Sequence, residues 1–448
     1  MLGVNFMVNI EQSAELLWNK ANYLIPNGNS LLSKQKSLFL PSGWPAYFTK
    51  TNGIFVWDLD ENVYKDFLFA VGTNSLGYNN PAVNSQVLKT VSDGVMSTLN
   101  CPEEVELAER LIALHPWSAM AKFARTGGEA NAIAVRIARA ATGRDKIAIC
   151  GYHGWHDWYL AANLKSDNLD EHLIPGLKAV GVNSSLAETT YSFYYNQYEQ
   201  LEQLVNKHSL AAVIMEVERS IPPEDCFLQK VRDLCNKHSI VLIFDECTSG
   251  FRETFGGLHL KYGINPDLAM FGKALGNGYA INAVLGKREI MEHAKDCFIS
   301  STNWTERIGP VAALATLNEM DRIKSWNILK DQGNYFRHKL TALMTKHEIS
   351  VSFTGLPALT VTQYSSSKFP ASEQNIFRTL LTEKLLKKGF LSCHLFYVSV
   401  KHTTDEIDVY LNVMEALVDE ILHNLQQGQS LRSQLRSTEA HLTFGRLA

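Results

Sequence analysis

The sequence lacks the marks of membrane-spanning, secreted and nucleic-acid-binding proteins. Its 448 residues contain no apolar run near the ~18 residues that a membrane-spanning helix needs. The N-terminal stretch MLGVNFMVNIEQSAELLW has no basic region ahead of an apolar core, so we expect no secretory signal peptide. The net charge is only −4, which gives no electrostatic reason to expect binding to nucleic acid or to an anionic membrane.

Cysteine is scarce and irregularly placed. The seven cysteines are scattered from Cys101 to Cys393 without CxxC spacing, which favours free thiols in a reducing, cytoplasmic compartment. His153, His156 and Asp157 are close in sequence, but their spacing suits neither helical ligands four residues apart nor a closed zinc site. We therefore expect no metal.

Two apolar runs, each followed by a reactive side chain, dominate what the sequence does contain. The run SIVLIF (239–244) suits a strand buried on both faces of a parallel sheet, and Asp245 follows it directly. A second run at 268–271 precedes Lys273, which stands before the glycine-rich ALGNG. Open α/β sheets bind ligands beyond the carboxyl ends of their strands, so both side chains are predicted to reach one crevice. A salt-bridged acid and a surface lysine in an ordinary α/β enzyme are the alternative interpretation.

A buried acid and a lysine in one crevice suit pyridoxal phosphate. Lys273 would form the Schiff base, and Asp245 would pair with the pyridinium nitrogen so that the ring acts as an electron sink. A phosphate site is predicted upstream, where a strand at 122–125 leads through Thr126, Gly127 and Gly128 into a helix. Free backbone N–H groups and the helix dipole favour an anion there, although a glycine turn between strand and helix is common.

The segments LIFDECTSGFR (242–252) and NPDLAMFGKALGNG (265–278) resemble the paired signature of class III, fold type I, pyridoxal-phosphate aminotransferases, most closely the glutamate-1-semialdehyde aminomutase branch. The resemblance covers about residues 15–425. It implies an α/β fold in which a large domain has a mostly parallel central sheet flanked by helices, and a small α+β domain is formed by the N- and C-terminal segments. We expect an N-terminal segment at 1–80, the large cofactor domain at 81–325, the small domain at 326–427 and a polar, partly ordered tail at 428–448.

The resemblance also assigns the site. It implies that Lys273 and Asp245 are catalytic and that Tyr152 stacks on the cofactor ring, with Cys247 on the other face where valine is usual. The phosphate would be held by Thr126, Gly127 and Gly128, where many members have Ser-Gly-Thr, and by Thr302 of a neighbouring subunit. This makes the expected protein a homodimer with shared active sites. The residues implied as possible substrate-binding or supporting groups are Glu216, His153, Glu306 and Arg307.

The resemblance implies transfer of an amino group from a donor, expected to be an amino acid, to an aldehyde or ketone acceptor. Glutamate-1-semialdehyde-type aminomutation within one molecule is the alternative, and a non-catalytic pyridoxal-phosphate-binding protein is a second one. The aminomutases carry an N-terminal arginine that fixes the substrate carboxylate. The comparable stretch here, 29–36, has no arginine, and Lys34 or Lys36 lacks a bidentate grip. This favours the intermolecular reaction. The long polar stretch 159–195 is interpreted as a lid or substrate loop.

Overall fold

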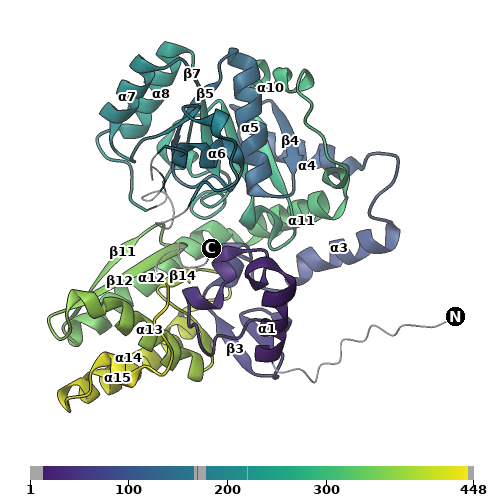
Figure 1. Ribbon diagram of the computed structural model, residues 1–448. Coiled ribbons are helices and arrows are strands. Elements are labelled where there is room, and N and C mark those ends of the chain that lie inside the picture. Colours follow the sequence, from purple (N-terminus) through teal and green to yellow (C-terminus); the bar gives the residue numbers. More distant parts are fainter. Residues whose placement is uncertain (1–13, 166–168, 170–177, 219, 442–448) are drawn as a thin grey trace.

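The computed structural model describes residues 14–165, 169, 178–218 and 220–441. Figure 1 shows one large sheet with helices on both faces and, below it, a second lobe in which the first and last parts of the chain lie together. This is the α/β architecture with a mostly parallel central sheet that the sequence predicts.

The central sheet has seven strands among the described residues, and β10 alone runs against the other six. In spatial order they are β4 (Met120–Ala124), β10 (Asn282–Gly286), β9 (Leu268–Phe271), β8 (Val241–Glu246), β7 (Leu210–Met215), β5 (Lys146–Cys150) and β6 (Thr190–Ser192). Every residue of β7, β8 and β9 is buried, as expected for strands covered by helices on both faces.

Helices cover both faces of this sheet (Figure 1). The helices of this lobe are α3 (Pro81–Asp93), α4 (Pro102–Leu114), α5 (Gly127–Thr142), α6 (Asp157–Leu160), α7 (Tyr198–Lys207), α8 (Phe227–His238), α9 (His259–Tyr262), α10 (Arg288–Met291) and α11 (Ile308–Ile323). The start of α5 is fixed by a capping box, in which the Thr126 hydroxyl accepts from the Glu129 N–H and the Glu129 carboxylate accepts from the Thr126 N–H.

The second lobe combines the two ends of the chain. Its strands are β1 (Phe48–Asn52), β2 (Phe55–Asp58), β3 (Val63–Asp66) and β13 (Phe390–Leu391) in one sheet, and β11 (Ile349–Thr354), β12 (Leu359–Ser366) and β14 (Leu395–Tyr397) in another. Its helices are α1 (Ala14–Leu24), α2 (Phe69–Gly72), α12 (Ser325–Lys346), α13 (Gln374–Lys387), α14 (Thr404–Gln426) and α15 (Leu431–Gln434). One apolar core unites Phe67 and Phe69 with Phe336 and Phe396. The exact division of the chain at 80, 325 and 427 stays a prediction.

Two segments bear on the sequence-based expectations. The tail after 428 is docked up to residue 441, because Leu431 is buried and the Glu383 carboxylate accepts hydrogen bonds from the Arg436 and Ser437 N–H groups at 2.9 and 3.1 Å. The stretch 159–195 contributes the edge strand β6, paired with β5, rather than loop alone. Residues 166–168 and 170–177, central to the lid interpretation, lie outside the described residues.

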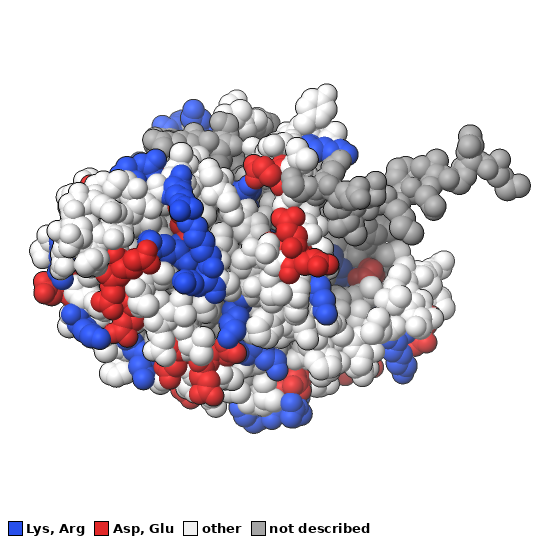
Figure 2. Space-filling model, turned by 90° about the horizontal axis from the view of Figure 1, so that it is seen from below, with Lys and Arg blue, Asp and Glu red and all other residues white. Residues whose placement is uncertain are grey.

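Figure 2 shows Lys and Arg interspersed with Asp and Glu over the face of the molecule seen there, in keeping with the near-balanced charge. No helix within the described ranges is both long and apolar enough to cross a membrane.

Candidate active site

The register of the parallel strands brings the predicted site residues to one edge of the sheet. Cys150 at the end of β5 pairs with Met215 of β7, which pairs with Phe244 of β8. The residues that follow these strand ends therefore lie side by side, and they include Tyr152, Glu216 and Asp245. On the far side of β8, Glu246 pairs with Phe271 at the end of β9, two residues before Lys273.

Asp245 is buried, with 5% of its surface exposed, and three donors surround its carboxylate. Oδ2 accepts from His153 Nδ1 at 2.9 Å and from Asn131 Nδ2 at 2.8 Å, and Oδ1 accepts from the Cys247 N–H at 3.1 Å. Burial alone would raise the pKa of this carboxyl group, but the hydrogen bonds and the charge of His153 outweigh it and hold the pKa below its ordinary value. A carboxylate that stays ionised in a buried place can hold a proton on a neighbouring ring nitrogen.

Lys273 stands at the start of the turn Lys273–Gly276, with a backbone φ of 41°. A left-handed conformation costs about 1–3 kcal/mol for a residue other than glycine, and it persists where the surroundings over-determine it. Its ammonium donates to Thr248 Oγ1 at 2.7 Å. Thr248 follows β8 three residues after Asp245, so the lysine amine and the buried acid both lie beyond the adjacent ends of β8 and β9.

The first turn of α5 has the form of an anion cradle. The N–H groups of Gly127 and Gly128 have no hydrogen-bond partner within the described part of the chain, whereas Thr126 is engaged as the N-cap. A Cβ at Gly127 would lie 3.5 Å from Cys247 Sγ, which places this turn beside the end of β8. A Cβ at Gly128 would lie 2.7 Å from the ring of His156, which belongs to the loop after β5. Glycine at position 128 therefore leaves room for that loop.

Tyr152 and Cys247 follow the ends of β5 and β8, respectively. The Tyr152 ring is 39% exposed, and its backbone N–H donates to Glu216 Oε2 at 3.2 Å. Glu216 is itself buried, so it supports the loop that carries Tyr152 and is not a plain surface acid. The Cys247 thiol donates to Asn282 Oδ1 at 3.6 Å, and burial raises its pKa well above the ordinary value. A neutral, packed thiol is consistent with a filler on one face of a ring.

The remaining predicted residues are engaged elsewhere or exposed. Arg307 forms a bidentate ion pair with Glu103 at 2.6 and 3.0 Å, away from Lys273. Glu306 accepts from the Ile308 N–H at 2.6 Å and so caps α11; it also lies 3.7 Å from the Arg125 guanidinium. Thr302 is exposed on this subunit.

Of the two N-terminal lysines, the ammonium of Lys36 is already paired with Glu15 at 2.6 Å, and Lys34 is exposed. Neither has the two-pronged grip of an arginine.

Several polar residues at this edge were not predicted. Asn131 links Asp245 to the His153 carbonyl, and its position on the buried face of an otherwise apolar helix was a usable signal. Thr248 and Asn282 give no such signal, because they acquire a role only through contacts between distant segments.

Arg252 is also new: it is fully buried, and it donates to the Thr248 carbonyl at 3.1 Å and to the Gly72 carbonyl. It therefore joins the segment that follows β8 to the N-terminal turn α2, where Phe69, Ala70 and Val71 all have positive φ.

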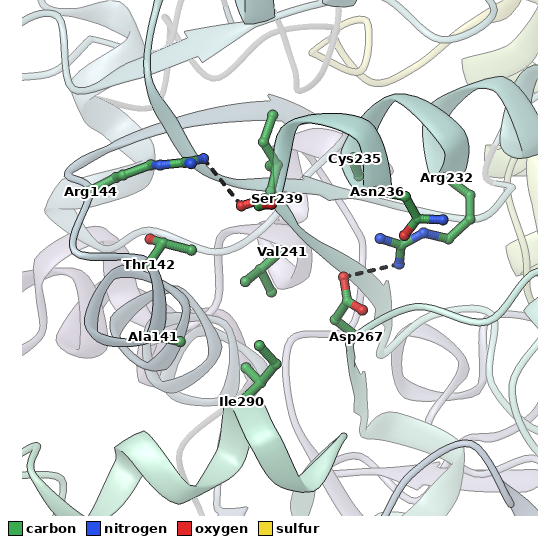
Figure 3. A pocket seen from close by; sticks show the side chains of 11 residues that line it. Ala141, Thr142, Arg144, Arg232, Cys235, Asn236, Ser239, Val241, Asp267 and Ile290 are labelled. Atoms are coloured by element: carbon green, nitrogen blue, oxygen red, sulfur yellow. Dashed lines mark hydrogen bonds and ion pairs between the residues drawn. The ribbon is translucent and has the colours of Figure 1, made fainter.

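A cavity of about 380 Å³ lies at the opposite edge of the sheet and takes no part in this chemistry. Figure 3 shows its lining at the beginnings of β8 and β9, with Arg144 donating to the Ser239 carbonyl and Arg232 paired with Asp267. Ligands of open α/β sheets bind beyond the carboxyl ends, so the crevice at Asp245 and Lys273 is the candidate site.

The residues at the carboxyl edge fit pyridoxal phosphate. The donor set around Asp245 keeps an acid ionised in the interior, Asn131 Oδ1 is buried without a partner beside it, and two unpaired amides face the space at the start of α5. An ionised acid, an amine and an anion cradle are what the ring nitrogen, the carbonyl group and the phosphate of this cofactor require. Fold and site together define a pyridoxal-phosphate-dependent transferase of fold type I.

Comparisons with known proteins agree. Residues 42–416 match the model of the family described as Aminotransferase class-III. The chain is 32% identical over 409 residues to the 3-aminobutyryl-CoA aminotransferase of Cloacimonas acidaminovorans, which covers 87% of this chain and 93% of that protein. It is 32% identical over 357 residues to the glutamate-1-semialdehyde 2,1-aminomutase of Methanothrix thermoacetophila, covering 78% and 81%.

Among solved structures, the FumI protein of Sphingopyxis sp. MTA144 superposes with a TM-score of 0.82 at 24% identity, covering 94% of this chain and 99% of that one. The chain belongs to the class III aminotransferases and is an enzyme with pyridoxal phosphate as cofactor. The resemblance seen in the sequence is confirmed, and a non-catalytic protein is not what the relatives support.

Proposed function

We propose that this enzyme is a transaminase that moves an amino group between two small molecules, with Lys273 and Asp245 as its catalytic residues. The observation that carries the assignment is their convergence beyond the adjacent ends of β8 and β9. When bound, pyridoxal phosphate supplies an electron sink for bond changes at the amine-bearing carbon. The Lys273 amine would hold the cofactor covalently and would move the α-proton of the substrate, as base and then as acid. The Asp245 carboxylate holds the proton on the ring nitrogen.

The other residues bind and orient. The amides of Gly127 and Gly128 bind the phosphate with the dipole of α5, and Thr126 sets the start of that helix. The Tyr152 ring would cover one face of the cofactor and Cys247 the other. His153 supports the site through its hydrogen bond to Asp245, and Glu216 supports it by accepting a hydrogen bond from the Tyr152 backbone N–H.

Transfer between molecules is favoured over transfer within one molecule by the N-terminal segment. The stretch 29–36 offers no arginine for a substrate carboxylate, and Lys36, its buried cation, is neutralised by Glu15. The donor is an amino acid and the acceptor an aldehyde or ketone in this proposal. Aminomutation remains the second candidate, because an aminomutase is as similar to the chain as an aminotransferase is.

We further propose a cytoplasmic homodimer. Exposed apolar side chains gather on α3, α4 and the segment between them: Leu88, Val91, Met96, Leu99 and Val105. A group of this kind, on two helices that both pack on α11, supports an interface with a second copy. The exposed Thr302 would then reach the phosphate of the other subunit. No disulfide joins any of the seven cysteines within the described residues, which supports a cytoplasmic location.

The deciding experiment is titration of the holoenzyme with glutamate, alanine and 4,5-diaminovalerate while the visible absorbance of the cofactor is followed. Stoichiometric bleaching by one amino acid, reversed by a keto acid, is the expected result and identifies the donor. A response to 4,5-diaminovalerate alone would assign the aminomutase reaction instead.

The lysine is identified separately by borohydride reduction and peptide mass spectrometry. The adduct is expected on the peptide that contains Lys273 and is expected to be missing in Lys273→Ala. An adduct on another lysine would show that the assignment is wrong. Sedimentation analysis tests the dimer, for which twice the mass of one chain is expected.

A further inference from the structure

The loop after β5 is pressed against the first turn of α5. A Cβ built on Gly154, whose φ is 105°, would lie 3.0 Å from Gly128 Cα, so the two backbones touch without side chains between them. The loop continues into His156, whose ring takes the space that a side chain on Gly128 would occupy. The imidazole is therefore part of the wall of the anion cradle.

His156 presents an unused polar atom at this place. Its Nδ1 is buried and has no hydrogen-bond partner among the described residues, and it lies 2.8 Å from the position of a Cβ on Gly128. The ring is held by the Trp155 indole, stacked at 4.6 Å between centroids with an interplanar angle of 27°. A buried, oriented and unpaired nitrogen is costly unless a ligand or solvent meets it.

We propose that His156 is a ligand of the cofactor phosphate, donating a hydrogen bond from Nδ1 beside the amides of Gly127 and Gly128. Glycine at position 128 has no side-chain donor. The His156 imidazole, in the loop after β5, takes that role. This inference rests on the proposed function, since it needs the phosphate to sit at the start of α5. The carboxylates that face the ring are Glu129 on α5 and Asp157 on its own element.

The test compares binding of pyridoxal phosphate and of pyridoxal, which lacks the phosphate, to the apoprotein. His156→Ala is expected to weaken binding of pyridoxal phosphate about ten-fold or more, the factor that corresponds to about 1.4 kcal/mol, and to leave binding of pyridoxal within about two-fold. His208→Ala is the matched control. His208 precedes β7, at the opposite edge of the sheet, where its ring stacks on Tyr191, so the affinities for pyridoxal phosphate and for pyridoxal should both stay unchanged. His156→Asn keeps a donor near Nδ1 and is expected to retain most of the difference between the two ligands.

A reciprocal exchange sharpens the test. Gly128→Ser alone is expected to weaken binding of pyridoxal phosphate, because its Cβ would lie 2.7 Å from the His156 ring. Combined with His156→Ala, the same serine has room and offers a hydroxyl donor, so the double variant should bind pyridoxal phosphate more tightly than either single variant.

Equal losses for both ligands in His156→Ala, or no loss at all, would overturn the proposal. If the alanine variant does not fold, His156→Phe decides, because it keeps a ring of similar size but has no donor: it should weaken binding of pyridoxal phosphate alone, whereas a packing role predicts no loss for either ligand. Failure here would leave the adduct on Lys273 intact, whereas absence of that adduct would remove the cofactor assignment on which this inference rests.

Discussion

Removing the Asp245 carboxylate separates its structural role from its catalytic role. The loss of buried hydrogen bonds is measured as stability of the apoprotein, and the loss of charge beside the ring nitrogen is measured as turnover of the holoenzyme. In the apoprotein, Asp245→Ala leaves the His153 and Asn131 donors and the Cys247 amide facing a buried space. Breaking a buried, hydrogen-bonded pair costs about 3–5 kcal/mol, so the free energy of unfolding in urea should fall by about that amount. Asp245→Asn keeps an oxygen acceptor and most of the volume, and about 1–3 kcal/mol should be lost.

Turnover should fall in both variants, because neither can hold a proton on the ring nitrogen by charge. Asp157→Asn is the control: this acid is exposed at the start of α6, and its loss should change unfolding by no more than about 0.5 kcal/mol. Turnover of Asp245→Asn equal to wild type would refute the pyridinium role. An unchanged urea midpoint in Asp245→Ala would refute the account of the buried hydrogen bonds.

Three further outcomes are expected. Glu246 is fully buried; burial alone would raise its pKa, but hydrogen bonds, the first from His259 Nδ1, hold the pKa below the ordinary 4.5. The contribution of Glu246 to the free energy of unfolding is therefore complete above pH 4.5 and is lost as the pH falls. The urea-midpoint gap between wild type and Glu246→Gln should thus narrow below pH 4.5, and a constant gap would contradict this. Gly272→Ala should destabilise the fold by about 1–3 kcal/mol in urea, because its Cβ would lie 2.0 Å from Oδ1 of the buried Asn282 side chain; a change under about 0.5 kcal/mol would show that this side chain moves aside freely. Arg252→Met should lower kcat, because the Arg252 hydrogen bonds that join the Gly72 turn to Thr248, the acceptor of the Lys273 ammonium, are lost. The melting temperature should change little, and an unchanged kcat would rule out this coupling.

The sequence was sufficient for the residues whose signal is local. Asp245 and Lys273 each follow an apolar run, and such runs became strands with every residue buried. The family match now supports the class of enzyme that these motifs indicated, while the roles of individual residues stay predictions. The edge strand β6 was missed because three residues in a polar stretch carry no period of their own and become a strand only by pairing with β5.

Contacts between distant segments were out of reach for the same reason. Nothing near Thr248 in sequence announces the lysine 25 residues later that donates to it. The tail after 428 reads as polar, yet Leu431 and Leu435 at a spacing of one helical turn are enough to dock it against α13 and α14. A short amphipathic pattern is weak evidence for a helix in the sequence alone, because its apolar residues become buried only where other helices offer an apolar surface.

The segment 66–77 has a consequence for how the enzyme comes into being on the ribosome. Asn277, in the turn that carries Lys273, binds the backbone of Leu76 and Gly77 at 3.0 and 3.2 Å. That early segment is in turn held by late ones, since the Tyr397 and Val400 N–H groups donate to the carbonyls of residues 67 and 75. The lysine is translated before two thirds of the chain is complete, but its support is not finished until the last fifth has emerged. A nascent chain that ends before residue 397 therefore contains both predicted catalytic residues but lacks these two hydrogen bonds to the segment that Asn277 binds.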